Sequence, residues 1–167
     1  PMLADAELVN KAFEGREDEI NTCIGCNQAC LDHYFEGKEI SCLVNPRACH
    51  ETKLNYEATT SPKKIAVVGA GPAGLAYATV AAGRGHSVTL YDAGTEIGGQ
   101  FNLAKQVPGK EEFYETLRYY SRMLEVHHVD VRLNTRVSVD DLRQGGYEHV
   151  VVATGITPRV PDIEGID

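Results

Sequence analysis

The sequence predicts an α/β fold, in which a Rossmann-like domain with a parallel sheet and flanking helices follows a loop-rich cysteine segment. An apolar, β-branched run at 65–68 breaks into closely spaced glycines and then into an alanine-rich, helix-forming stretch. A second apolar run at 87–92 completes a strand–helix–strand unit of roughly 30 residues, the size of a right-handed crossover between parallel strands. All five cysteines precede this unit, between Cys23 and Cys49. We therefore expect two differently built parts in one chain.

Composition and charge limit the kinds of partner. The chain has 167 residues, 43% of them hydrophobic and 24% charged, as in soluble globular proteins. Its net charge of −8 and its 16 scattered basic residues argue against nucleic acid, whose phosphates require concentrated Lys and Arg. No apolar stretch approaches the roughly 20 residues of a membrane span, and no signal-peptide pattern is present. We expect a cytoplasmic protein with no nucleic-acid partner and no membrane segment. Because the chain opens on Pro1 rather than Met, we also expect an excised piece of a larger protein.

The N-terminal third shows little of the periodicity that a hydrophobic core requires. Residues 1–22 predict one short surface helix, with Asp5 as its N-cap and Gly15 at its end. Residues 23–50 hold the cysteines without a long period, which predicts a loop-rich segment folded around something other than a hydrophobic core. Residues 51–63 are mostly polar and contain Ser-Pro, so we expect a linker.

Residues 64–167 carry the patterns of the Rossmann-like domain. Continuous apolar runs predict parallel strands that are buried on both faces, including the run at 149–155. The longest predicted helix is amphipathic, and its apolar face consists of Phe113, Leu117, Tyr120 and Leu124. The expected order is a strand at 65–68, a helix at 72–84, a strand at 87–92, a loop at 93–109, a helix at 110–127, a strand at 129–133, a helical turn at 140–144 and a strand at 149–155.

The glycines after the first strand match a Gly-x-Gly-x-x-Gly turn. In such a turn the first glycine, Gly69, permits the bend, the second, Gly71, lets the backbone approach a pyrophosphate, and the third, Gly74, lets helix and strand pack closely. The phosphates would then meet the positive end of the helix dipole. Asp92, at the end of the second strand, is expected to accept hydrogen bonds from ribose hydroxyls. The alternatives are a tight turn without a ligand and, for Asp92, an ordinary turn residue. The turn alone does not separate FAD from NAD.

The cysteine spacing predicts a metal centre. Cys23, Cys26 and Cys30 lie within eight residues, and Cys42 follows after eleven more. Four thiolates suit a tetrahedral zinc ion or a [4Fe–4S] cluster. Three ligands from one loop and a distant fourth favour the cluster, since structural zinc usually takes its thiolates from two Cys-x-x-Cys hooks. Zinc stays open as the alternative. Cys49 is left over and is expected to be a buried free thiol, with a role as a further ligand as the alternative.

Several segments resemble known flavoenzymes. Gly98-Gly99-Gln100 is similar to the loop that covers the flavin in pyridine-nucleotide-dependent flavoenzymes, and Val152-Ala-Thr-Gly155 is similar to the strand end at which their chain returns to the FAD domain. Together with the glycine turn, the segments 18–32 and 41–51 closely resemble the bacterial NADPH-dependent 2,4-dienoyl-CoA reductases. A looser resemblance extends to trimethylamine dehydrogenase and related members of the old yellow enzyme group. The resemblance covers essentially the whole chain.

This resemblance implies an internal piece of an iron–sulfur flavoenzyme. Residues 1–22 would be the tail of an FMN-binding (β/α)8 barrel, 23–50 a [4Fe–4S]-binding segment, and 51–63 a linker. Residues 64–167 would form part of an FAD domain into which an NADPH domain is inserted. Electrons would pass from NADPH to FAD, through the cluster to FMN, and then to a 2,4-dienoyl-CoA.

The resemblance also implies site residues. The cluster ligands would be Cys23, Cys26, Cys30 and Cys42. The residues against FAD, besides the glycines of the turn, would be Gln28, Ala73, Asp92, Gln100, Lys110 and Val137. On this pattern the barrel and the NADPH domain lie outside the chain, so we assign no catalytic residue and expect no substrate turnover by the chain alone. Its partners would be the nucleotide cofactors and those two domains. The alternatives are a trimethylamine dehydrogenase-like oxidoreductase and a non-enzymatic zinc- and nucleotide-binding module.

Overall fold

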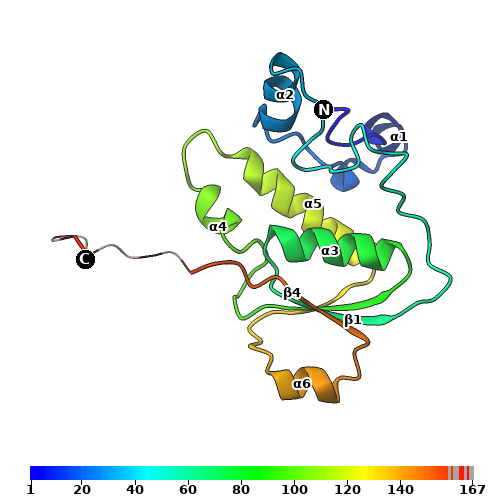
Figure 1. The fold of residues 1–167 in the computed structure, drawn as a ribbon, viewed down its shortest axis with the longest axis vertical. Coiled ribbons are helices and arrows are strands. Elements are labelled where there is room, and N and C mark those ends of the chain that lie inside the picture. Colours follow the sequence, from blue (N-terminus) through cyan, green and yellow to red (C-terminus); the bar gives the residue numbers. More distant parts are fainter. Residues whose placement is uncertain (158, 160–161, 164, 166–167) are drawn as a thin grey trace.

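The computed structural model has the predicted α/β fold and describes residues 1–157, 159, 162–163 and 165 (Figure 1). The domain predicted at 64–167 therefore ends in residues that lie partly outside the described ones, namely 158, 160–161, 164 and 166–167.

Four strands form one parallel sheet in the described residues. They are β1 (Lys64–Val68), β2 (Ser87–Tyr91), β3 (Asp130–Arg132) and β4 (His149–Val152), in the order β3-β2-β1-β4 across the sheet. The chain moves outward from β1 to β2 and β3, and then returns to the other side of β1. The strand order thus reverses at β1. In open α/β sheets, ligands bind at the carboxyl ends of strands beside such a switch point.

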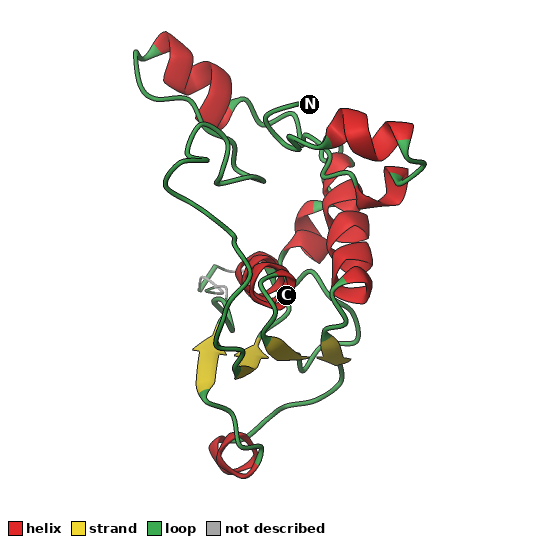
Figure 2. Ribbon diagram, turned by 90° about the vertical axis from the view of Figure 1, so that its right-hand side faces the viewer, coloured by secondary structure: helices red, strands yellow, loops and turns green. Residues whose placement is uncertain are grey.

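Helices cover the two sides of the sheet unequally. α3 (Pro72–Gly83) and α5 (Glu112–Val126) lie over one side, whereas the shorter α6 (Val139–Gln144) lies on the other (Figure 1 and Figure 2). The remaining elements are α1 (Leu8–Phe13), a 3-10 turn (Glu17–Glu19), a π-helical turn (Gln28–Asp32) that continues into α2 (His33–Phe35), and α4 (Phe101–Ala104). No helix in the described part of the chain is long and apolar enough to cross a membrane.

The hydrophobic core lies between the sheet and helices α3 and α5. Leu75 of α3 and Leu90 and Val67 of the sheet are fully buried there. On α5, Leu117 and Leu124 are buried as the periodicity predicts, while the two aromatic members of that face are only half-buried. The apolar faces of two helices and one sheet therefore form a single core.

The N-terminal helix begins differently from the prediction. α1 follows Glu7, whose side chain makes no capping hydrogen bond, so the predicted N-cap at Asp5 is wrong. Asp5 lies two residues before the N-cap, and its Oδ1 accepts the Glu7 backbone N–H at 2.9 Å. It is buried, and its Oδ2 accepts hydrogen bonds from Lys11 Nζ at 2.7 Å and from the Asn21 backbone N–H at 2.8 Å. These partners offset the cost of burying a charge. Gly15, with a φ of +70°, follows the helix as predicted.

Other departures concern short helices and the last strand. Residues 28–35 are helical inside the segment expected to be loop-rich, and α4 interrupts the loop expected at 93–109. The strand expected to be buried at 149–155 is short and lies at the sheet edge, with Val152 73% exposed. An apolar run predicts a strand with neighbours on both sides, whereas β4 pairs with β1 alone in the described residues.

Residues 51–63 contain neither helix nor strand. Their backbone is nevertheless anchored at the end of α3, because the Thr59 N–H donates to Arg84 O at 2.8 Å and the Lys63 N–H donates to His86 Nδ1 at 3.1 Å. The division of the chain into barrel tail, cysteine segment and linker stays a prediction.

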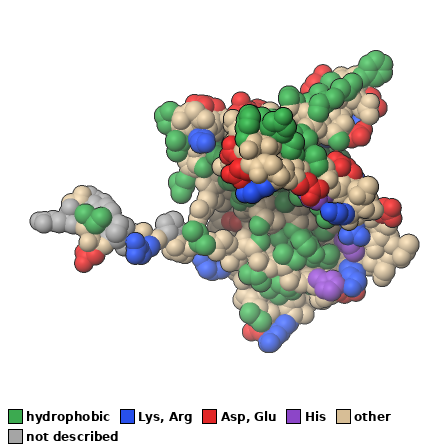
Figure 3. Space-filling view, turned by 45° about the horizontal axis from the view of Figure 1, so that its top comes forward, with side chains coloured by type: hydrophobic (Ala, Val, Ile, Leu, Met, Phe, Trp, Pro, Cys, Tyr) green, Lys and Arg blue, Asp and Glu red, His purple; other side chains and the backbone are tan. Residues whose placement is uncertain are grey.

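Exposed hydrophobic side chains gather on the upper part of the face seen in Figure 3. In the N-terminal part of the chain the most exposed large ones include Phe13, Tyr34 and Phe35. Lys and Arg side chains are scattered over this face rather than gathered in one patch.

Leu75→Ala is expected to lower the free energy of unfolding by about 2–5 kcal/mol, because it leaves a cavity between α3 and the sheet. Val139→Ala is the control, since Val139 begins α6 and is 63% exposed; its effect should stay within about 0.5 kcal/mol. Urea unfolding followed by far-ultraviolet circular dichroism measures both. Equal losses in the two variants would contradict the position of the core.

Candidate functional site: a nucleotide cleft and a cysteine segment

A cleft of about 870 Å³ opens at the carboxyl ends of the four strands. The glycine turn enters it from β1, Asp92 from β2, residues 135–137 from β3 and residues 153–157 from β4. Gln100 and Phe101 close one side. The cleft therefore lies where the reversal of strand order predicts a ligand.

The three glycines of the turn meet three different needs. A Cβ on Gly69 would lie 2.2 Å from Ala153 O, and a Cβ on Gly74 would lie 1.8 Å from Gly69 O, so protein atoms close both positions. Gly69 also has a φ of +111°, which favours glycine. A Cβ on Gly71 would meet nothing within 4 Å, and its φ of −76° suits any residue. Packing within the protein does not require a glycine at position 71, whereas a ligand lying against the backbone there does.

The same turn provides a site for an anion. α3 has twelve residues, its N-cap is Gly71, and no side chain caps it. Pro72 stands in the first turn and has no N–H, so Ala73 supplies the first N–H that lines the cleft. The first N–H groups of a helix have no partner within the helix, and the helix dipole adds partial positive charge. A pyrophosphate fits this position.

The Asp92 side chain forms hydrogen bonds with the backbone of the protein itself. Its Oδ2 accepts the Ala70 N–H and its Oδ1 accepts the Gly94 N–H, both at 2.6 Å. The carboxylate thus connects the glycine turn to the loop after β2. Each oxygen has a second lone pair, so Asp92 can hold this turn and also accept a hydrogen bond from a ribose hydroxyl in the cleft.

The loop after β2 packs directly on the glycine turn. The Gly98 N–H donates to Ala70 O at 2.7 Å, and a Cβ on Gly99 would lie 3.0 Å from the Cα of Gly71. On the far side of the cleft, Gln100 Nε2 donates to Ile156 O at 3.3 Å. The loop lies where it can cover a ligand held at the turn.

Six of the nine residues predicted to contact a nucleotide line the cleft: Gly69, Gly71, Ala73, Asp92, Gln100 and Val137. Gly74 is buried behind the turn, as its packing role requires. Lys110 lies in the exposed loop before α5, and Gln28 lies in the cysteine segment. The structure does not bring these two to the cleft, and their contacts with FAD stay predictions.

Several cleft residues with polar side chains escaped the sequence reasoning, notably Thr135, Arg136 and Thr154. Their positions in the sequence could have indicated them, because Thr135 and Arg136 lie shortly after a predicted strand and Thr154 lies at the end of one. Tyr91 also lines the cleft, at the end of β2. Burial and a 2.7 Å hydrogen bond to the Tyr147 hydroxyl raise the pKa of Tyr91 to about 12. Its phenol therefore stays neutral near pH 7.

The second candidate site is the cysteine segment. Of the predicted ligands, Cys23 is exposed and the other three are half-buried. The Ser41 N–H donates to Ala29 O at 2.8 Å. This bond links the residue before Cys42 to the residue before Cys30. It therefore holds the backbone at these two cysteines close together.

The thiols do not converge on a single point. Among the described residues, no three Cys, His, Asp or Glu side chains form a group that could hold one metal ion. The four thiolates have the donor chemistry of either a zinc site or a [4Fe–4S] cluster. The choice between the two and the four ligands stay predictions. Cys49 is exposed, so the expectation of a buried thiol is wrong; it lies in a turn with a φ of +64°.

The fold and the cleft together define a Rossmann-like dinucleotide-binding domain. The chain belongs to the pyridine nucleotide-disulphide oxidoreductase family, whose model matches residues 63–167. Membership in this family implies that the domain binds FAD.

Curated relatives match the whole chain and not this domain alone. A metal reductase from Desulforamulus reducens is 42% identical over 99% of the chain and 26% of its own length. A cinnamate reductase from Clostridium sporogenes is 35% identical over 100% of the chain and 25% of its own length. A dimethylamine dehydrogenase from Hyphomicrobium is 34% identical over 93% of the chain and 23% of its own length. The chain spans about a quarter of the length of these relatives.

A solved structure agrees with this grouping. The complex of 2-naphthoyl-CoA reductase with 2-naphthoyl-CoA is 38% identical, with a TM-score of 0.94 over 99% of this chain and 26% of that chain. The similarity therefore includes the cysteine segment. The relatives are oxidoreductases, which supports a flavoprotein related to the old yellow enzyme and trimethylamine dehydrogenase group.

Gly71→Ala tests the cleft with little disturbance of the fold. The added methyl group meets no protein atom, so stability should fall by less than about 1 kcal/mol. The affinity for FAD should fall by at least about tenfold, because the methyl group occupies the place where the pyrophosphate approaches the backbone. Equilibrium dialysis against FAD gives the affinity.

Gly74→Ala is the contrasting variant. Its Cβ would lie 1.8 Å from Gly69 O, so it should cost more than about 3 kcal/mol of stability whether or not FAD is present. A folded Gly71→Ala chain with unchanged FAD affinity would rule out the pyrophosphate position.

Proposed function

We propose that the chain is the electron-transfer midsection of an iron–sulfur flavoenzyme. It passes electrons from NADPH-reduced FAD, through a [4Fe–4S] cluster, to FMN for the reduction of a 2,4-dienoyl-CoA. FAD occupies the cleft, and Cys23, Cys26, Cys30 and Cys42 hold the cluster. FMN and NADPH bind in parts of a longer cytoplasmic protein, since the chain spans about a quarter of its relatives.

The observation that carries this proposal is the presence of two sites on one connected scaffold. The similarity to the D. reducens metal reductase extends over both the cysteine segment and the cleft domain. In the structure, α5 contacts the 3-10 turn before the cysteines on one side and α3 of the nucleotide domain on the other. The same helix would therefore hold in place both the domain that binds FAD and the segment that binds the cluster.

The chain's own residues have defined tasks in this scheme. Gly71 lets the pyrophosphate lie against the backbone, Ala73 offers it an N–H, and Asp92 accepts from the ribose. Gln100 shields the cleft by reaching across to Ile156. Bound FAD would supply an acceptor for a hydride and a donor of single electrons, and a bound cluster would supply a one-electron carrier.

The names of the relatives support the reductive direction. Cinnamate reductase and 2-naphthoyl-CoA reductase are named for a conjugated acid and a conjugated acyl thioester. A 2,4-dienoyl-CoA belongs to the same chemical class, which is why we propose it as the substrate.

A second candidate is an amine-oxidising, trimethylamine dehydrogenase-like enzyme, which the similarity to dimethylamine dehydrogenase favours. The two candidates differ in what reduces the flavin. Anaerobic addition of NADPH or of dimethylamine to the longer protein separates them, because only the true reductant bleaches the flavin absorbance.

Metal and flavin analysis of one anaerobically purified sample tests the proposal. We expect about four irons, an equal amount of acid-labile sulfide and about one FAD per chain. One zinc per chain without iron would overturn the proposal and support a non-enzymatic zinc- and nucleotide-binding module.

Serine substitutions test the ligand set. Cys26→Ser should lose most of the iron, because a hydroxyl replaces a thiolate ligand. Cys49→Ser is the matched control and should keep its iron, since Cys49 lies outside the predicted set and is exposed. Iron content relative to the unsubstituted protein is the readout, and loss of iron in the Cys49 variant alone would reverse the assignment.

A further inference from the structure

We infer that Arg118 of α5 is a positioning residue that sets the placement of the cysteine segment relative to the nucleotide cleft. The inference rests on the proposed function, because this placement affects activity only if electrons pass between the two sites.

The Arg118 guanidinium uses all three of its nitrogens. Its Nε forms an ion pair with Glu115 on the same helix at 2.6 Å. Its two terminal nitrogens donate to Asp18 O at 2.5 Å and to Ile20 O at 2.8 Å, and one of them also reaches the Thr22 hydroxyl at 3.5 Å. These three acceptors lie directly before the first cysteine, about 100 positions from Arg118 in the sequence.

The geometry of these contacts requires an arginine. A guanidinium spreads five N–H donors over a planar fork, whereas a lysine ammonium donates from a single point. Carbonyl groups at the end of a helical turn have no partner within it, and Asp18 O and Ile20 O lie in or just after the 3-10 turn. Arg118 therefore supplies donors that the segment lacks.

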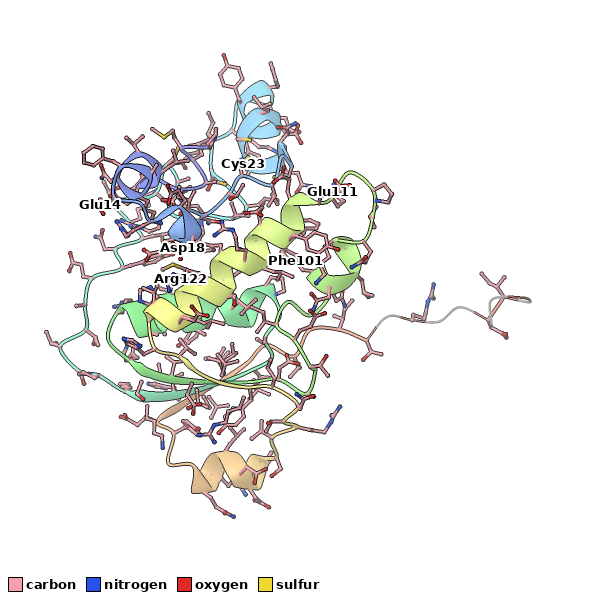
Figure 4. All side chains as sticks on the ribbon, turned by 180° about the vertical axis from the view of Figure 1, so that it is seen from behind. Glu14, Asp18, Cys23, Phe101, Glu111 and Arg122 are labelled. Atoms are coloured by element: carbon pink, nitrogen blue, oxygen red, sulfur yellow. The ribbon has the colours of Figure 1, made fainter. Side chains whose placement is uncertain are left out.

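A second arginine, one turn further along α5, holds the same segment through side chains. Arg122 forms ion pairs with Asp18 Oδ2 at 2.7 Å and with Glu19 Oε1 at 3.5 Å. Figure 4 shows Arg122 and Asp18 next to each other, with Cys23 further along the same side of α5. Glu19 is buried and also pairs with Arg16 at 2.7 Å. The segment is thus fixed on both sides.

The apolar side of α5 packs against the loop that borders the cleft. A Cβ on Gly98, whose φ is +117°, would lie 2.8 Å from Leu117 Cδ2, and a Cβ on Gly99 would lie 3.0 Å from Gly71 Cα. Leu117 directly precedes Arg118. A continuous path of close contacts therefore runs from the glycine turn, through residues 98–99 and α5, to the segment before the cysteines. This path sets the distance between the nucleotide cleft and the cysteine segment. The proposed function depends on that distance, because electron transfer slows steeply as distance grows.

The test compares Arg118→Lys with Arg143→Lys. The control arginine lies on α6, and its exposed guanidinium pairs with Asp140 at 3.5 Å. In Arg118→Lys, amide hydrogen exchange over residues 18–26 should rise by on the order of tenfold, since charge-assisted hydrogen bonds to the segment are lost. Exchange in β1 should stay unchanged in both variants, which verifies the fold.

A kinetic readout separates positioning from simple stability. In the longer protein, loaded with its cofactors and mixed rapidly with NADPH, flavin reduction should keep its rate in Arg118→Lys, while reoxidation of the flavin by the cluster should slow. In Arg118→Ala, added guanidinium should restore the second rate and methylammonium should not, because only guanidinium reproduces the planar fork.

The outcomes are distinct. Exchange over residues 18–26 and flavin reoxidation that match those of Arg143→Lys would overturn the inference. Absence of iron from the unsubstituted protein would count against the proposed function instead. The exchange comparison needs neither cofactor and would then decide the inference alone. If Arg118→Lys also loosens β1, the guanidinium rescue of Arg118→Ala decides it.

Discussion

The close approach of three backbone segments at Gly69 is the constraint on which the rest of the structure depends. Gly69 fits against Ala153 O only without a side chain, and Gly74 fits against Gly69 O for the same reason. This contact brings the first turn of α3 to the point where the strand order reverses. The cleft, the N–H groups at its base and the position of Asp92 all follow from it.

Helix α5 extends this constraint to the N-terminal part of the chain. Its apolar face buries Leu117 and Leu124 in the core of the sheet, and its polar face presents two arginines to the segment before the cysteines. Helix α5 has one face in each part of the chain. It fixes the position of one part relative to the other, because protein interiors are close-packed and deform little. The two candidate sites are therefore parts of one scaffold, although their sequences have little in common.

Local patterns were enough to predict the strands, the two long helices and the glycine turn. Features that depend on distant partners were not predictable. Asp5 looks like a helix cap in the sequence and does accept the nearby Glu7 N–H, yet its other oxygen binds Lys11 and the distant backbone of Asn21. The apolar run of β4 predicts burial, but burial depends on how many strands flank it. Arg118 shows no motif, because its acceptors lie about 100 positions away. The cysteine spacing predicts the chemistry of a cluster without predicting the arrangement of its thiols.

The central claim is that one chain holds FAD and an iron–sulfur cluster in electronic contact. Anaerobic reductive titration of the holoprotein, followed by visible absorption and electron paramagnetic resonance, tests it most directly. Bleaching of the flavin band together with the signal of a reduced iron–sulfur cluster is the predicted result. A flavin band that bleaches completely without any iron signal would contradict the claim.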